Sequence, residues 1–244
     1  MLFYFNWTET TIFARYFIMV KKFLFIAMLL TTVANSAQIH EAGIFVGGSN
    51  YIGDIGPTNY ILPSNFAGGI IYKYNLNPRI ALRGTFTYAQ ITSDDSDSDN
   101  EARKLRDLNF TNDIKEFAVG VEFSYFEYNS SSDSKTYTPY LLLEFAAYNY
   151  KTTVTETSPN QYTYENKTSY SIPFGVGYKT RIAESFALSL EIGARYTFKD
   201  DLDFNHNEIP SLQFGNPNNN DWYVFSGIHL TYTFGRPACY NTPN

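Results

Sequence analysis

The feature that most constrains this chain is the strict alternation of the segment "FALSLEIGARYTF", residues 186–198. Its even-numbered positions are all apolar, whereas its odd-numbered positions are small or polar and include Glu191 and Arg195. Successive side chains of a β-strand point to opposite faces, so the segment predicts a strand with one wholly apolar face. In a soluble protein that face would lie in the core. In a membrane barrel it would meet lipid, and the charged face would line the interior.

Seven other segments repeat this pattern, and each is about as long as the 9–11 residues that cross a bilayer at a tilt. Short connections such as "NPR" and "AES" alternate with long ones. This rhythm predicts an all-β fold, an eight-stranded antiparallel transmembrane β-barrel with short periplasmic turns, long extracellular loops and both termini in the periplasm. The other predicted strands are residues 40–48, 65–76, 79–89, 113–128, 138–150, 169–181 and 222–234, and the long loops are residues 49–64, 90–112, 151–168 and 199–220.

A secreted β-sandwich is the competing fold, because it would bury the apolar faces between two sheets. The aromatic content of 18%, with 21 Tyr and 21 Phe, suits the aromatic girdles of a membrane barrel. Together with the loop rhythm, it favours the barrel. No run of about 20 apolar residues indicates a bundle of transmembrane helices. The net charge of −6 gives no reason to expect a nucleic-acid partner.

The N-terminal segment is predicted to be a signal peptide that begins at Met19. It has a basic start, an apolar core too short to span a membrane, and small residues before a cleavage site after Ser36 or Ala37. Residues 1–18 are interpreted as an over-extended gene start. We therefore expect three parts: residues 1–37, which are removed, residues 38–236, which form the outer-membrane barrel, and residues 237–244, which form a periplasmic tail.

The face opposite the apolar one collects five acids and four bases. The interior of an eight-stranded barrel is just wide enough for side chains to fill, and buried charges persist only when they are paired. We therefore predict a plug of ion pairs rather than a path for protons or solutes. The nine residues are Glu41, Lys73, Arg83, Glu116, Glu122, Glu144, Lys179, Glu191 and Arg195.

We expect no catalytic, cofactor-binding or metal-binding residues and no small-molecule substrate. A lipid-modifying barrel enzyme would need a Ser–His pair at the membrane face, and none is evident. His229 is expected to form hydrogen bonds in the lumen, while His40 lies at the mature N-terminus and His206 in a long loop. The stretch "DDSDSDNEAR" lacks the Gly and the terminal Glu of a calcium-binding loop, so a solvated loop is the expectation.

The single cysteine, Cys239, lies just beyond the last predicted strand. One cysteine excludes an internal disulfide, and an odd cysteine in an exported protein suggests an intermolecular bond. An inert thiol is the alternative. Pro237 discourages further strand pairing, so the tail is predicted to leave the barrel as a short extended arm.

Two segments, "QIHEAGIFVGGSNYIGDIGPTNYI" after the signal peptide and "YTFGRPACY" near the end, resemble the PorG family of the Bacteroidota type IX secretion system. The eight-strand architecture agrees over essentially the whole mature chain, whereas the long loops carry no family signature. The resemblance implies an outer-membrane component associated with the periplasmic ring of the lipoprotein PorK and its partner PorN. It further implies that Cys239 bonds to PorK, and that the role is structural and non-enzymatic, serving secretion and, in some members, gliding motility. A free-standing small barrel with a structural or adhesive role is the alternative.

Overall fold

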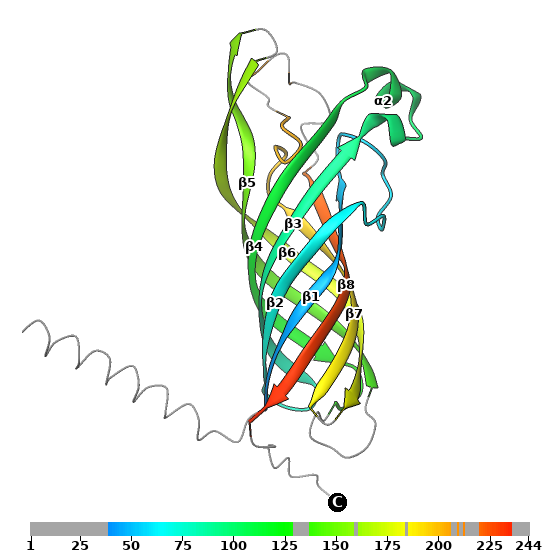
Figure 1. Cartoon of the computed structure of the whole chain (residues 1–244), viewed down its shortest axis with the longest axis vertical. Coiled ribbons are helices and arrows are strands. Elements are labelled where there is room, and N and C mark those ends of the chain that lie inside the picture. Colours follow the sequence, from blue (N-terminus) through cyan, green and yellow to red (C-terminus); the bar gives the residue numbers. More distant parts are fainter. Residues whose placement is uncertain are drawn as a thin grey trace, which may run out of the picture.

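The computed structural model describes residues 39–128, 137–158, 161–183, 185–205, 209, 212 and 220–235. Its eight strands follow one another around a closed antiparallel barrel, in which each strand pairs with its neighbours in sequence (Figure 1). The fold class predicted from the sequence is therefore confirmed. The strands are β1 (Ile39–Ile52), β2 (Asn65–Asn75), β3 (Ile80–Asp94), β4 (Asn109–Ser124), β5 (Tyr137–Ser158), β6 (Gln161–Ala183), β7 (Phe186–Thr197) and β8 (Trp222–Phe234).

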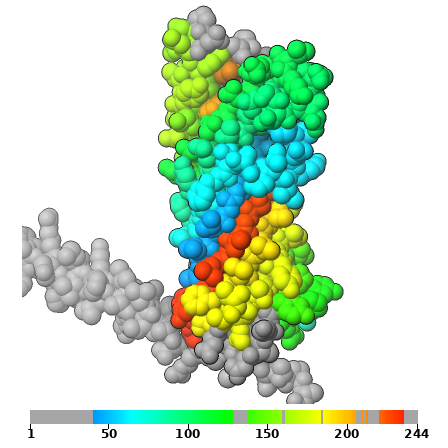
Figure 2. All heavy atoms as spheres, turned by 45° about the vertical axis from the view of Figure 1, so that its right-hand side comes forward, coloured from blue at the N-terminus to red at the C-terminus, as the bar shows by residue number. Residues whose placement is uncertain are grey.

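The barrel closes between its first and last strands. The β1–β8 register runs from His40 opposite Phe234 to Ile52 opposite Trp222, so the seam extends along the full length of β8. Closure removes the sheet edges that would otherwise present unpaired backbone N–H and C=O groups. The strands run obliquely, as the diagonal bands of colour in Figure 2 show.

The barrel distributes polarity in the reverse of a soluble protein. In β7, the side chain of Leu190 points outward and is 56% exposed, whereas the next residue, Glu191, points inward and is 7% exposed. The same alternation holds on β4 and β5, and the barrel has an apolar outer surface. Exposed large apolar residues on that surface include Ile44, Ile70, Phe86, Phe117, Val119, Val121, Leu141, Leu143, Phe145, Val176, Ile228 and Leu230.

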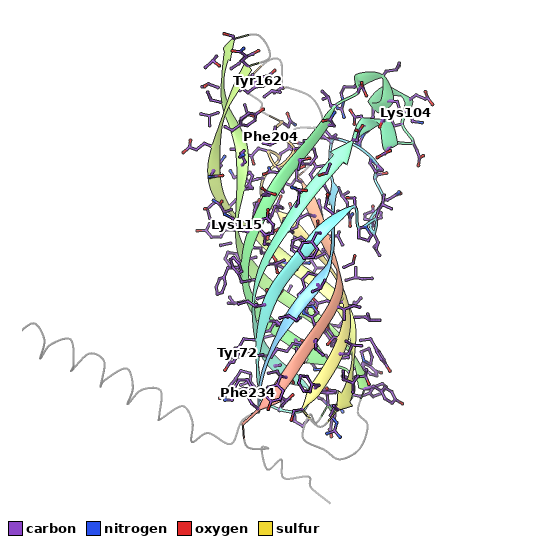
Figure 3. The ribbon with its side chains drawn as sticks, in the orientation of Figure 1. Tyr72, Lys104, Lys115, Tyr162, Phe204 and Phe234 are labelled. Carbon is purple, nitrogen blue, oxygen red and sulfur yellow. The ribbon has the colours of Figure 1, made fainter. Side chains whose placement is uncertain are left out.

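Most connections differ in length between the two ends of the barrel. At the end where β1 begins and β8 ends (the terminus end), β2 and β3 are joined by a tight turn in which the Asn77 side chain accepts hydrogen bonds from the backbone N–H groups of Arg79 and Ile80, at 2.9 and 2.8 Å. At the same end β6 and β7 are joined by residues 184–185, whereas β4 and β5 are joined by the longer segment 125–136. At the opposite end, the long segments 53–64, 95–108 and 198–221 connect the strands. Figure 3 shows this division, with Lys104 at the loop end and Tyr72 and Phe234 at the terminus end.

The prediction of a long loop at residues 151–168 is wrong. Strands β5 and β6 continue past the barrel as a two-stranded hairpin, paired as far as Ser158 opposite Gln161, and only residues 159–160 separate them. The hairpin stands above the barrel (Figure 1). Pairing with β4 reaches only as far as Asn149, and pairing with β7 begins only at Ser171. The hairpin therefore lies outside the closed wall of the barrel, and its sequence lacks the apolar alternation of that wall.

The predicted loop at residues 90–112 also contains regular structure. Strand β3 continues to Asp94, β4 begins at Asn109, and the 3₁₀-helix η1 (Asp95–Asp97) and the helix α2 (Glu101–Arg106) lie between them. Asn100 caps α2 by accepting a hydrogen bond from the Ala102 N–H at 2.9 Å. No helix in the described part of the chain is long and apolar enough to cross a membrane.

Candidate functional site in the barrel interior

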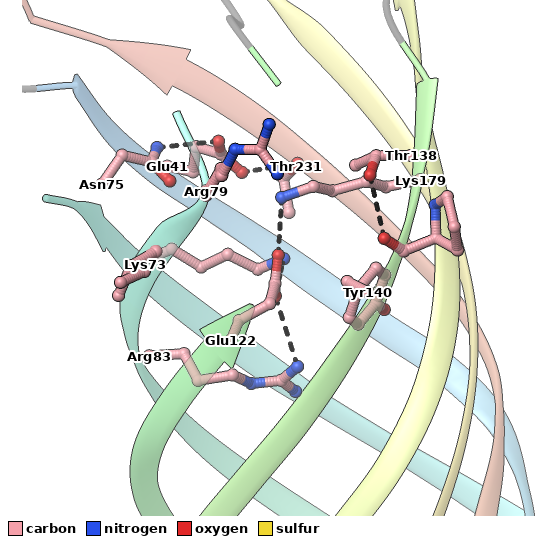
Figure 4. A network of polar contacts seen from close by, with 12 residues as sticks. Glu41, Lys73, Asn75, Arg79, Arg83, Glu122, Thr138, Tyr140, Lys179 and Thr231 are labelled. Atoms are coloured by element: carbon pink, nitrogen blue, oxygen red, sulfur yellow. Dashed lines mark hydrogen bonds and ion pairs between the residues drawn. The ribbon is translucent and has the colours of Figure 1, made fainter. Parts of the chain in front are cut away.

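The barrel interior holds all nine charged side chains that the strand pattern assigned to the lumen, and each of them is buried. They come from seven of the eight strands and meet because inward positions of neighbouring strands pair directly, as Lys73 does with Arg83 across β2 and β3. The nine are Glu41, Lys73, Arg83, Glu116, Glu122, Glu144, Lys179, Glu191 and Arg195. Part of this network is shown in Figure 4.

Glu122, on β4, is the centre of the network. One of its carboxylate oxygens lies 2.6 Å from the Lys73 ammonium, and the other lies 2.6 Å from the Lys179 ammonium. The guanidinium of Arg83 approaches the same carboxylate at 3.5 Å. One carboxylate thus contacts three cations, which come from β2, β3 and β6.

Arg83 joins this centre to two further carboxylates. Its guanidinium donates two hydrogen bonds to Glu191, at 2.8 and 3.2 Å, a bidentate arrangement. Its Nε atom forms an ion pair with Glu144 at 2.9 Å, without hydrogen-bond alignment. The three cations Lys73, Arg83 and Lys179 therefore face the three carboxylates of Glu122, Glu144 and Glu191, so the charges of this group cancel.

The remaining interior charges lie above and below this group. Towards the loop end, Glu116 pairs with Arg195 at 3.4 Å and accepts a hydrogen bond from the Tyr223 hydroxyl at 2.6 Å. Towards the terminus end, Glu41 accepts hydrogen bonds from the Asn75 amide at 2.9 Å and the Thr231 hydroxyl at 3.5 Å. The carboxylates are thus held by donors along the barrel axis.

The interior leaves little free space. One internal cavity, between Arg83, Glu191 and Arg195, has a volume of about 10 Å³. A single water molecule needs about 10–15 Å³, so this level of the barrel admits at most one. The arrangement suits a structural plug and does not provide a continuous path at this level.

Inward-facing tyrosines complete the plug, and the sequence analysis did not single them out. Tyr140 donates a hydrogen bond to Glu191 at 2.8 Å, and Tyr150 donates one to Asp201 at 2.5 Å. Both are buried, together with Tyr148 and Tyr223. The signal was available, because these residues share the strand parity of the buried charges. Gly177 makes room for the Tyr140 ring, since a Cβ atom at this glycine would overlap it.

Neither of the two histidines that the structure describes, His40 and His229, forms an accessible catalytic pair with a serine. His229 is buried, its Nε2 atom lies 3.4 Å from a Glu191 oxygen, and its ring packs on Phe45 with centroids 4.8 Å apart. Ser189 stands opposite His229 across β7 and β8, but His229 lines the 10 Å³ cavity, which cannot admit a substrate. His40 stacks with aromatic residues at the terminus end. His206 lies outside the described residues, as does Cys239.

An acidic cluster lies at the loop end of the barrel, around residues 200–205. Burial, together with the nearby Asp54, Asp203 and Asp201 carboxylates, raises the pKa of Asp200 to about 7. Burial raises the pKa of Asp203 to about 6, in spite of hydrogen bonds from the Asn205 N–H and from Tyr51. Within the described part of the chain, no group of three His, Cys, Asp or Glu residues is arranged to hold a metal ion.

Asp95 lies in the loop that was predicted to be solvated, but its side chain is buried and links neighbouring segments. Burial alone would raise its pKa, but the Arg106 guanidinium and the backbone N–H groups of Gly56 and Leu108 lower it below its usual value. Arg106 holds both carboxylate oxygens, at 2.7 and 2.9 Å. Asp95 therefore ties η1 to α2 and to the segment after β1.

Comparison with known proteins places the chain in a family. Residues 20–243 match a family described as a domain of unknown function, DUF6089. The chain belongs to the DUF6089 family. The DUF6089 region covers the whole barrel and includes Cys239. A search of curated proteins found no match of significant similarity.

Several solved structures are similar to this DUF6089 protein. A major outer membrane protein from Thermus thermophilus is 13% identical, with a TM-score of 0.47, and the alignment covers 82% of this chain and 100% of that one. The N-terminal β-barrel domain of Pseudomonas aeruginosa OprF is 10% identical, with a TM-score of 0.43 and coverage of 82% and 98%. The attachment invasion locus protein Ail of Yersinia pestis is 15% identical, with a TM-score of 0.42 and coverage of 82% and 100%. Similarity at this level carries no information on function.

Proposed function

We propose that this protein is an outer-membrane barrel whose apolar outer surface faces lipid, with its termini in the periplasm and its long loops outside the cell. Two aromatic bands support this position. At the loop end, Trp222 packs against Tyr196, with ring centroids 5.0 Å apart. At the terminus end, Phe186 packs against Tyr232, with centroids 5.2 Å apart. Such girdles mark the two interfaces of membrane barrels, and the 13 residues of β8 suffice to connect them.

Most of the connections support this orientation. Outer-membrane barrels have short turns on the periplasmic side and long loops outside. The tight turn at residues 76–79 and the short β6–β7 connection lie at the end where β1 begins and β8 ends, although the β4–β5 connection at that end, residues 125–136, is longer. This asymmetry supports a periplasmic position for the tail.

We further propose that the barrel anchors a periplasmic assembly through Cys239, as a PorG-type component of a type IX secretion machine whose ring contains PorK and PorN. The observation that carries this proposal is a plugged barrel followed directly by an arm with the chain's single cysteine. Gly235 has a φ of +103°, which favours glycine, and lets the chain turn away after Phe234.

A covalent link suits the small surface at this end. Specific protein interfaces usually bury at least about 1,200 Å² in total, and two of the three connections at this end are short turns that offer little area for such a contact. A disulfide from a short arm would hold the partner at a high effective concentration without a large interface. The role that we propose is thus mechanical and needs no conducting pore.

The test is a non-reducing gel of outer membranes from cells that carry the wild-type protein or Cys239→Ser. We expect a higher-mass band in the wild type that contains a periplasmic lipoprotein and disappears on reduction. Cys239→Ser should lack that band but still insert, because the last strand of the barrel, β8, ends at Phe234. Identical migration of the two proteins without reductant would rule out the covalent anchor.

The projecting β5–β6 hairpin favours a second candidate, a free-standing barrel that binds an external partner through its loops. Residues 151–168 lie beyond the paired parts of β4 and β7 and present exposed strand edges. Shortening the hairpin would abolish binding in this case and leave the Cys239 adduct unchanged. Loss of the adduct with normal surface binding would favour the anchor.

A further inference from the structure

A half-enclosed groove lies on the outside of the barrel at its loop end. It has a volume of about 740 Å³, within the range of about 300–1,000 Å³ typical of small-molecule sites. Its floor is the outer wall of β6, β7 and β8, and its roof is the segment after β1. The floor includes Phe174, Val176, Ile192, Ala194, Trp222 and Val224.

The segment after β1 folds back over the outer surface of the barrel. Val224 has the outward parity of Trp222, yet it is only 3% exposed. Asn50, also at an outward position, donates hydrogen bonds to the backbone carbonyls of Asn59 and Tyr60, at 3.3 and 3.4 Å. In Figure 2 the cyan segment between β1 and β2 lies above the orange and yellow surface of β8 and β7. Specific hydrogen bonds therefore hold the segment that forms the roof of the groove.

Arg103, on α2, fixes the roof and supplies a charge at the rim. Its guanidinium donates hydrogen bonds to the Gly56 and Gly53 carbonyls, at 2.6 and 3.1 Å. Arg103 also lines the groove, as do Tyr60 and Ile61. Lys104 and Arg106 lie on the same short helix, but Arg106 is paired with Asp95, so Arg103 is the charged residue that the groove itself offers.

We infer that this groove binds an acyl chain of an anionic lipid from the leaflet at the loop end, with the lipid phosphate beside Arg103. The apolar floor continues the lipid-facing surface of β6–β8, and the positive charge lies at the end where headgroups would be. Tyr60 is 77% exposed and Ile61 is 55% exposed, so the roof also offers apolar contacts to a chain. A bound lipid would cover both and lock the loop. This inference rests on the proposed membrane position.

The test uses the full-length protein, purified in mixed micelles that contain either phosphatidylglycerol or phosphatidylcholine, with retained lipid counted by native mass spectrometry. We expect one phosphatidylglycerol to be retained about fivefold more strongly than phosphatidylcholine, as one favourable charge contact allows. Ala194→Trp fills the groove from its floor and should abolish retention. Ala42→Trp, also outward but at the terminus end between Tyr72 and Tyr232, should retain the lipid.

A second pair of variants tests the charge. Arg103→Gln and Lys104→Gln each remove one positive charge from α2, but only Arg103 lines the groove. We expect Arg103→Gln to remove the preference for phosphatidylglycerol and Lys104→Gln to preserve it. Equal retention by Ala194→Trp and Ala42→Trp, or equal retention of the two lipids by the wild type, would overturn the inference. Failure of the wild type to insert into bilayers would instead overturn the membrane position on which it rests.

Discussion

Replacing Glu122 by Gln tests whether the interior is a dry network of ion pairs. The substitution keeps the shape of the side chain but removes the one negative charge that contacts Lys73 and Lys179, both at 2.6 Å. The side chains of these two lysines are only 2% and 3% exposed, so water cannot replace the lost partner. In the variant, two carboxylates remain opposite the three cations of this group. Removing one partner of a buried pair costs about 3–5 kcal/mol, and we expect a loss of unfolding free energy in that range.

The assay is equilibrium denaturant unfolding in lipid vesicles, followed by the fluorescence of Trp222. Glu101→Gln, on the exposed helix α2, is the control and should change the unfolding free energy by no more than about 0.5 kcal/mol. Adding Lys179→Met to Glu122→Gln returns the group to two charges of each sign. The double variant should therefore recover part of the lost stability, so the two effects should not add. A Glu122→Gln cost as small as that of the control would refute the reasoning and indicate a hydrated interior.

Two further predictions concern the outer face and the loop end. Leu190→Arg, in the middle of the apolar surface, should reduce the unfolding free energy in vesicles by about 2–4 kcal/mol. Phe198→Arg, at the loop-end boundary of that surface, should reduce it by only about 0–1 kcal/mol. Equal costs would contradict the depth that we assign to these residues. Because the folded state raises the pKa of Asp200 to about 7 and of Asp203 to about 6, it holds these protons more tightly than the unfolded chain does. Residues 199–205 should therefore be most stable below about pH 4, the ordinary pKa of an aspartate, and should lose this stability progressively as the pH rises to about 7. Amide hydrogen exchange of these residues at pH 5 and pH 8, corrected for the intrinsic exchange rate, checks this expectation. Asp200→Asn should weaken the dependence of the protection on pH. Protection that rises with pH would contradict the expectation.

The barrel wall could be predicted from the sequence because its outward and inward side chains differ sharply in polarity. Outward positions of β7 are apolar and inward ones small or polar, so the alternation identifies both the strand and the face of Glu191. The same parity indicates which charges face inward. It does not indicate which partner each charge meets, because that depends on the register between strands. The pairing of Arg83 with Glu191, which lie on opposite sides of the barrel, is visible only in three dimensions.

The parts beyond the closed barrel wall are less predictable because that alternation does not extend to them. Residues 151–168 of the β5–β6 hairpin lie beyond the pairing with β4 and β7, and their polar sequence predicts a loop. Its threonines, Val154, Tyr162 and Tyr164 favour strands and were the available signal. The groove under the segment after β1 depends on long-range contacts of Asn50 and Arg103, which no local pattern records.

The anchor role that we propose needs no large pore, and a barrel with a plugged interior can therefore perform it. An anchor must resist unfolding under load from a periplasmic partner, and a network that joins β2, β3, β4, β5, β6 and β7 around Glu122 and Arg83 ties the wall together across its interior. Removal of the tail should leave this network unchanged. The covalent anchor and the barrel are therefore separable by experiment.

The central claim, that the apolar outer face of the barrel meets lipid, is tested most directly by the fluorescence of Trp222. This residue is the only tryptophan outside residues 1–37, and it lies on the outward parity of β8 at the loop end. In vesicles that contain lipids brominated at defined depths, we expect strong quenching by bromine near the headgroups, weaker quenching by bromine near the bilayer centre, and little quenching by iodide in the water. Full quenching by iodide with none by brominated lipid would contradict the account.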